Sequence, residues 1–106
     1  MVFGDSWGTY GEDSFNKVMT KYNLSVRNIA VSGTTAREWA ENKTALVDAV
    51  RATPNCKYVW LTIVGNDAIP AMMDDEDINV FPAKIVNNTF VFLDLLFAEF
   101  PNIKVV

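Results

Sequence analysis

The chain has 106 residues, of which 50% are hydrophobic and 21% are charged. This length fits one small domain, and this composition is typical of a folded protein rather than a disordered one. The formal net charge of −4, without any cluster of lysines and arginines, argues against nucleic acid or an anionic membrane as a partner.

The first half of the chain predicts two strands and two helical regions. Residues 1–3 are apolar and indicate the end of a strand that stops at Gly4. Apolar residues then recur with the spacing of an amphipathic helix over about 13–22, with Asp13 as its N-cap. A second strand is expected at 26–31. The next helical region runs from about 35 to 52.

Thr35 and Glu38 begin that second helical region. Their spacing matches a capping box, in which a threonine hydroxyl and a glutamate carboxylate satisfy free backbone amides reciprocally. We expect a break near Asn42 and a buried face that includes Leu46, Ala49 and Val50.

The second half predicts a strand, a loop, a helix and a final strand. Residues 58–64 are almost continuously apolar, as expected for a central parallel strand buried on both faces. Residues 68–81 are expected to form a loop. Pro82 suits the first position of a helix that ends near residue 100, and a fourth strand is expected at 103–106.

The alternation of strands and helices predicts an α/β fold with a parallel sheet and right-handed crossovers. We expect a flavodoxin-like three-layer α/β/α architecture with strand order 2-1-3-4, in which a crevice opens between the first and third strands. Three small polar segments follow the strands that border this crevice: Gly4-Asp5-Ser6, Ser32-Gly33-Thr34 and Gly65-Asn66-Asp67. They are expected to converge there.

The chain contains one cysteine, Cys56, and no histidine. A single cysteine excludes an internal disulfide and a cysteine-rich zinc site, and we expect no metal and no cofactor. The acidic run from Asp74 to Asp77 lacks the spacing and the glycine of an EF-hand, which favours a solvated loop. Without histidine, the chain lacks the commonest general base.

The convergent segments hold the groups that acyl transfer requires. This chemistry needs an activated nucleophile and hydrogen-bond donors aimed at the developing oxyanion. Ser6 is the candidate nucleophile, and the oxyanion hole would consist of the Ser6 amide, the Gly33 amide and the Asn66 side-chain amide. Asp5 and Asp67 are expected to brace the loops by accepting backbone hydrogen bonds rather than to act as catalytic acids.

These segments resemble the conserved blocks of the SGNH (GDSL-type) hydrolases. Val2-Phe3-Gly4-Asp5-Ser6 is similar to the first block, residues 28–35 to the second, and Ile63-Val64-Gly65-Asn66-Asp67 to the third. The resemblance implies a serine esterase or lipase that acts on carboxylic esters of lipids or carbohydrates through an acyl-enzyme. It also implies that Ser6 is the nucleophile and that Gly33 and Asn66 supply oxyanion donors.

Two departures from the family pattern matter. Val64 stands where the third block usually carries a glycine. The family's last block, an aspartate and a histidine three residues apart, has no counterpart among these residues. We therefore expect residues 1–106 to be a partial domain that lacks the fifth strand, with its Ser-His-Asp triad completed outside them.

Substrate contacts are expected from Trp7, beside the nucleophile, and from Met72 and Met73 in the loop that walls the acyl pocket. Packing remains an alternative for Trp7, and an exposed connector remains an alternative for the loop. A non-catalytic flavodoxin-like binding domain is the alternative to the esterase.

Three N-glycosylation sequons begin at Asn23, Asn42 and Asn87. They favour a secreted or secretory-pathway glycoprotein, although such triplets also arise by chance. No membrane span is expected, because the most apolar run, residues 90–97, is short and contains Asp94. The expected ligand is a small ester.

Overall fold

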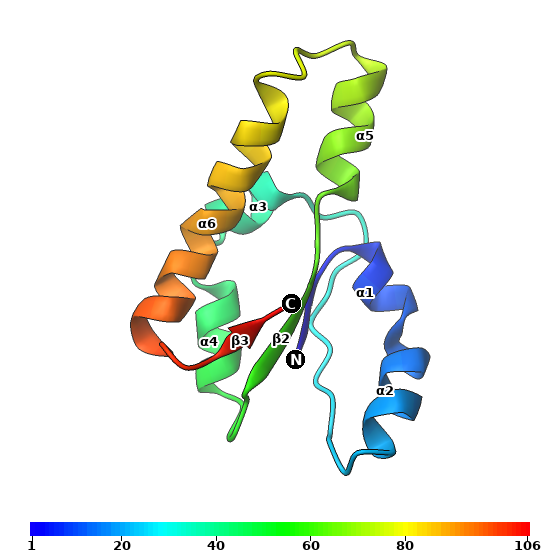
Figure 1. Cartoon of the computed structure of the whole chain (residues 1–106), viewed down its shortest axis with the longest axis vertical. Coiled ribbons are helices and arrows are strands. Elements are labelled where there is room, and N and C mark those ends of the chain that lie inside the picture. The colour runs from blue at the N-terminus through cyan, green and yellow to red at the C-terminus, as the bar shows by residue number, and fades with distance from the viewer.

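The computed structural model describes all of residues 1–106 and has the mixed α/β class that the sequence predicts (Figure 1). The elements in chain order are β1 (Val2–Gly4), α1 (Ser6–Tyr10), α2 (Glu12–Thr20), α3 (Ala36–Glu41), α4 (Ala45–Arg51), β2 (Tyr58–Thr62), α5 (Gly65–Met73), α6 (Phe81–Glu99) and β3 (Lys104–Val105).

The three strands form a small parallel sheet in the order β1-β2-β3. In the register of the sheet, Val2 lies opposite Trp60 and Tyr58 lies opposite Lys104. The central position predicted for the strand that begins at residue 58 is therefore confirmed.

The strand predicted at 26–31 is reduced to a single parallel bridge between Asn28 and Val2, on the free edge of β1. The segment still runs beside β1, because the Ile29 N–H donates to the Val2 carbonyl and the Val31 N–H donates to the Gly4 carbonyl, both at 2.9 Å. The prediction of a regular strand at 26–31 was wrong. β1 has only three residues, so it offers few backbone partners.

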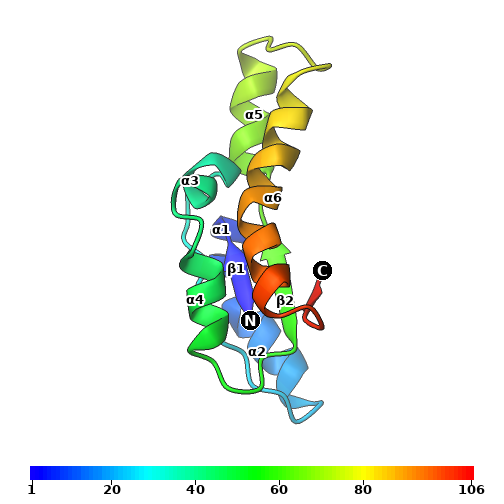
Figure 2. The same cartoon turned by 90° about the vertical axis from the view of Figure 1, so that its left-hand side faces the viewer.

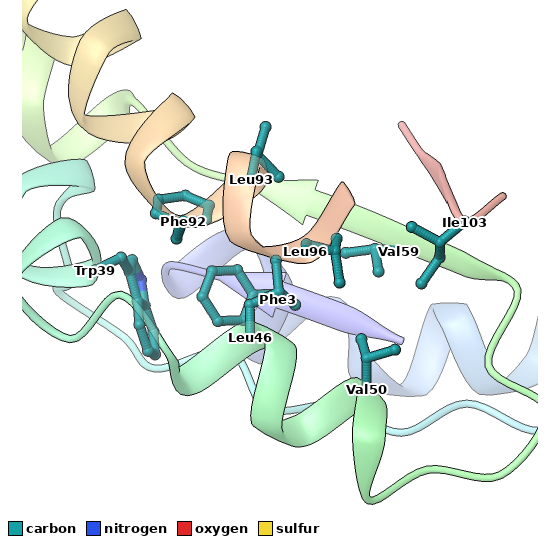
Figure 3. Packing of buried hydrophobic residues seen from close by; sticks show 9 residues of the cluster. All are labelled: Phe3, Trp39, Leu46, Val50, Val59, Phe92, Leu93, Leu96 and Ile103. Carbon is teal, nitrogen blue, oxygen red and sulfur yellow. The ribbon is translucent and has the colours of Figure 1, made fainter. Parts of the chain in front are cut away.

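The main core lies between the sheet and helices α3, α4 and α6 (Figure 3). Phe3 occupies its centre, with its ring 4.3 Å from that of Trp39 and 5.5 Å from that of Phe92. The other buried members of this cluster are Leu46, Val50, Val59, Leu93, Leu96 and Ile103. Because α6 contacts both α3 and α4, burial of these side chains fixes the three helices against the sheet.

The other side of the sheet is only partly covered. Phe15 of α2 meets Trp60 edge-on, with ring centroids 5.5 Å apart, yet Trp60 remains 45% exposed and Tyr58 53% exposed. The prediction that this strand is buried on both faces was therefore wrong. No residue of α2 is buried, and its N-cap is Gly11 rather than the predicted Asp13.

The predicted capping box is confirmed. The Glu38 N–H donates to the Thr35 hydroxyl, and the Thr35 N–H donates to the Glu38 carboxylate. The predicted break is confirmed as well, because Asn42 ends α3 before α4 begins. Leu46 and Val50 are buried as expected, and Ala49 is half-buried.

The loop predicted over 68–81 was wrong. α5 occupies Gly65–Met73 with Pro70 inside it, and only residues 74–80 connect it to α6. Proline normally disfavours a helix interior because it lacks an N–H and its ring crowds the preceding turn. Here α5 packs beside the start of α6, and the two helices extend together beyond the sheet (Figures 1 and 2).

The long helix predicted from Pro82 is confirmed as α6. Its length and composition alone would allow it to cross a membrane. Five of its residues are nevertheless buried in the protein: Phe81, Ile85, Phe92, Leu93 and Leu96. These five residues contribute to the core, while Val86, Phe90, Val91 and Phe97 of the same helix are exposed.

Candidate active site

The segment that follows β1 is held tightly against the end of β2. The Asp5 N–H donates to the Thr62 carbonyl at 2.7 Å. Gly4 has φ +135°, and a Cβ atom added to it would lie 1.7 Å from the Thr62 carbonyl oxygen. Only glycine can occupy this position without moving the strands apart.

Ser6 is the first residue of α1, and its side chain is half-buried. The preceding Asp5 caps the helix, because its Oδ1 accepts the Trp7 N–H at 3.1 Å. Asp5 is 1% exposed, so its carboxylate is a fixed part of the loop. The bracing role expected for Asp5 is confirmed.

Thr34 joins the second polar segment, Ser32-Gly33-Thr34, to the first, Gly4-Asp5-Ser6. Its hydroxyl lies 3.0 Å from the Gly4 carbonyl oxygen and 2.8 Å from that of Val31, both of which can accept its proton. The hydroxyl oxygen also accepts a hydrogen bond from the indole Nε1 of Trp39 at 2.9 Å. A core tryptophan thus contacts the loop that carries Gly33.

Asn66 joins the third polar segment, Gly65-Asn66-Asp67 at the start of α5, to the second. It is the second residue of α5, and its side-chain Nδ2 donates to the Thr34 carbonyl oxygen at 2.9 Å. Asp67 adds a further connection, because both of its carboxylate oxygens lie within 3.1 Å of the Ala36 N–H at the start of α3. The bracing role expected for Asp67 is confirmed.

Gly33 lies in an exposed turn with φ +86°. Its backbone N–H donates to no backbone carbonyl, and a Cβ atom at this position would meet no atom within 4 Å. An amide in this state is open to solvent and to a ligand.

Val64 adopts an unusual conformation at the N-cap of α5. Its φ is +100°, which lies in the region that favours glycine and is strained for a β-branched side chain. Its carbonyl accepts hydrogen bonds from the Asp67 and Ala68 N–H groups. The strained residue therefore starts the helix that carries Asn66.

The expected substrate-contacting residues are all exposed: Trp7 is 76% exposed, Met72 63% and Met73 79%. The two methionines form the last turn of α5 rather than part of a loop. Trp7 directly follows Ser6, whereas the two methionines lie at the opposite end of α5 from Asn66.

A cavity of about 370 Å³ lies beside Asn66, between α3, α5 and α6. Ala71, Phe81 and Ile85 supply its apolar lining, and neither Ser6 nor Gly33 borders it. The hollow therefore lies next to one proposed oxyanion donor rather than at the proposed nucleophile.

Thr34 and Trp39 are the contacts that sequence reasoning missed. A buried indole N–H needs an acceptor, and Thr34 is a hydroxyl residue five positions before Trp39. That requirement is the signal that would have pointed to the pair.

The strongest ionic contacts lie outside these loops. Arg51 hydrogen-bonds to Glu99 and Asp48, and these bonds raise the pKa of its guanidinium above the ordinary value. The bonds to Glu99 tie α4 to the end of α6, and the bond to Asp48 lies within α4. No group of three or more His, Cys, Asp or Glu side chains is arranged to hold a metal ion.

Comparison of the chain with models of known families, with curated proteins and with solved structures gave no match.

Proposed function

We propose that these residues form part of a serine ester hydrolase of the SGNH (GDSL-type) family, with Ser6 as its nucleophile. One observation carries the proposal. Thr34 hydrogen-bonds to Gly4 in the first loop and to Asn66 in the third, so the three segments that resemble the family's blocks are directly joined. Joint contact of three separate segments is stronger support than any one short motif.

In the proposed reaction, the Ser6 hydroxyl oxygen bonds to the ester carbonyl carbon, and the carbonyl electrons move onto the oxygen. The electrons then return to re-form the carbonyl as its bond to the alcohol oxygen breaks, and the alcohol leaves with the proton taken from Ser6. Water then hydrolyses the acyl-enzyme and restores the Ser6 hydroxyl. The serine proton goes to a histidine outside these 106 residues, because they contain none. In this scheme the Ser6 and Gly33 amides and the Asn66 side chain donate to the oxyanion.

The hydrogen bond that Asn66 already makes is compatible with this role. A primary amide has two N–H groups, and the bond to the Thr34 carbonyl uses one of them. The other is the proposed oxyanion donor. Removing one such donor typically costs about 3–4 kcal/mol of transition-state stabilisation.

We further propose that the fold is a flavodoxin-like three-layer α/β/α arrangement. The segment around Asn28, β1, β2 and β3 would then correspond to the strand order 2-1-3-4, and the site would lie where the strand order reverses. The pairing of Asn28 and of β2 with opposite edges of β1 supports this order.

For the substrate, we propose an ester whose acyl or alcohol group contacts Trp7, with Met72 and Met73 as adaptable apolar contacts. Their exposure leaves them free to meet a ligand. Replacing the two methionines with Gln in the active enzyme is expected to alter the dependence of kcat/KM on acyl-chain length. An unchanged dependence would remove these residues from the substrate site.

We also propose that the protein passes through the secretory pathway. The asparagines of all three sequons, Asn23, Asn42 and Asn87, are exposed, as glycan attachment requires. Expression in a eukaryotic secretory system followed by enzymatic deglycosylation should reduce the mass. No reduction would contradict the proposal.

The experiment that tests the hydrolase is an ester-cleavage assay on the longest open reading frame that contains these residues. Nitrophenyl esters of several acyl lengths are suitable substrates. Ser6→Ala is expected to lower kcat roughly 10⁴-fold or more, as for other triad nucleophiles, and Ser14→Ala on exposed α2 serves as the matched control. Equal activity of both variants would place the nucleophile elsewhere, and no ester cleavage by the unmodified protein would instead favour a non-catalytic binding domain.

A further inference from the structure

We propose that Thr34 is a positioning residue that sets the two outer donors of the oxyanion hole relative to Ser6, and that the core orients it through Trp39. The inference rests on the proposed function, because it assigns Thr34 a task within that site. It adds a residue that belongs to none of the expected catalytic or substrate-binding groups.

The first step concerns the Thr34 hydroxyl. A hydroxyl has one proton and two lone pairs. The Trp39 indole N–H occupies one lone pair at 2.9 Å, so the proton points away from the indole, towards the Gly4 or Val31 carbonyl. The proton and one lone pair of the hydroxyl are engaged within the protein, so the hydroxyl connects segments of the chain rather than reacting.

The Thr34 hydroxyl is held in place by the indole of Trp39. Trp39 is buried, and its ring packs 4.3 Å from that of Phe3 in the main core (Figure 3). Phe3 is the residue before Gly4 on β1. The ring contact between Phe3 and Trp39 therefore links β1 to α3, and the Thr34 hydroxyl lies between the end of β1 and Trp39. The indole N–H cannot turn away from Thr34 without disturbing the packed rings.

The third step concerns the two donors. The Thr34 carbonyl accepts the Asn66 side-chain amide at 2.9 Å, which determines where the second N–H of that amide points. Gly33 immediately precedes Thr34, so a shift of Thr34 also turns the Gly33 amide. One residue thus holds both donors while its hydroxyl lies 3.0 Å from the carbonyl oxygen of Gly4, two residues before Ser6.

Removal of the Thr34 hydroxyl is expected to misalign the Gly33 and Asn66 donors without removing any reacting group. Thr34→Val removes the hydroxyl with little change in shape and leaves the Gly4 carbonyl and the Trp39 indole without this partner. Thr34→Ser keeps the hydroxyl. Because small displacements of positioning groups strongly affect rate, Thr34→Val is expected to slow acylation of Ser6 roughly 10- to 100-fold, and Thr34→Ser should restore most of that rate.

The test has two readouts. The first is nuclear magnetic resonance of the 106-residue chain, which follows the Gly33 amide, the Asn66 side-chain amide and their hydrogen exchange. In Thr34→Val both signals should shift, and the Asn66 amide should exchange about tenfold faster or more. Thr34→Ser should resemble the unmodified chain. If Thr34→Val does not fold, Trp39→Phe removes the indole N–H contact together with part of the ring that packs against Phe3, and it should shift the same two signals.

The second readout is the rate at which a fluorophosphonate labels Ser6 in the longer open reading frame. Unmoved Gly33 and Asn66 signals in a folded Thr34→Val chain would overturn the positioning role, whatever the enzyme does. Shifted signals with an unchanged labelling rate would also overturn it. Shifted signals without labelling of any variant would support the Thr34 network and overturn the proposed hydrolase instead.

Discussion

The side-chain amide of Asn66 donates a 2.9 Å hydrogen bond to the backbone carbonyl of Thr34, across 32 positions of the sequence. This bond fixes the start of α5 against the turn that contains Gly33. It is the closest link in the structure between the two segments proposed to supply the outer oxyanion donors.

Replacing Asn66 with Asp should therefore destabilise the fold. The substitution preserves shape but places a carboxylate oxygen against the Thr34 carbonyl, so a donor becomes an acceptor. We expect the free energy of unfolding to fall by about 1–3 kcal/mol, the usual cost of leaving a partner unsatisfied. Urea denaturation measures it, and Asn16→Asp on exposed α2 is the control; equal stability of the two variants would contradict the expectation.

Gly4 and Gly33 should respond differently to the same substitution, although both have positive φ. Gly4→Ala forces a methyl group into the Thr62 carbonyl and is expected to cost about 4 kcal/mol or more, the range of exceptional mutations. Gly33→Ala meets open space and should cost only about 1–2 kcal/mol for its backbone angle. Thermal melting of the pair distinguishes them, and similar losses would be inconsistent with the described packing at Gly4.

Much of the fold could be predicted because it depends on local signals. The capping box at Thr35, the break at Asn42 and the helix after Pro82 each follow from nearby residues. The helix across Pro70 could not be predicted, because its proline disfavours a helix locally and only packing against α6 offsets that cost. The exposure of Trp60 could not be predicted either, because it depends on how little of the sheet α2 covers.

Part of the candidate site could also be predicted from the sequence, and part could not. Two of the three polar segments could be placed at strand ends from their sequence alone, and Asp5 and Asp67 could be recognised as braces. The segment with Gly33 instead follows a stretch that a single bridge attaches to β1. The role of Thr34 could not be predicted, because two of its four partners, Gly4 and Asn66, lie 30 and 32 positions away in the sequence.

Val64→Gly should raise the stability of the chain. A β-branched residue at φ +100° is strained by about 1–3 kcal/mol, and the substitution relieves part of this strain. Glycine also loses more conformational entropy on folding, which offsets about 0.5–1 kcal/mol of the gain. A net gain near 1 kcal/mol is expected in urea denaturation. Val86→Gly, at an exposed position within α6, should instead lose stability, because glycine is a poorer helix former than valine. Parallel losses in the two variants would show that Val64 is not strained.

Asp67→Ala should loosen α3. The substitution leaves the first amide of that helix, on Ala36, without its carboxylate acceptor and removes a negative charge from the helix N-terminus. The expected cost is about 1–2 kcal/mol, measured by urea denaturation. Asp94→Ala on the exposed side of α6 is the control, and a cost no larger than that of the control would exclude the capping role.

The most direct measurement of the central claim is the site of covalent labelling in the longest open reading frame that contains these residues. After reaction with a fluorophosphonate, tryptic cleavage at Lys17 releases a peptide that holds both Ser6 and Ser14, and fragmentation mass spectrometry separates the two. The account predicts a phosphonyl adduct on Ser6 that disappears in Ser6→Ala and persists in Ser14→Ala. An adduct on another residue, or an equal adduct in both variants, would contradict it.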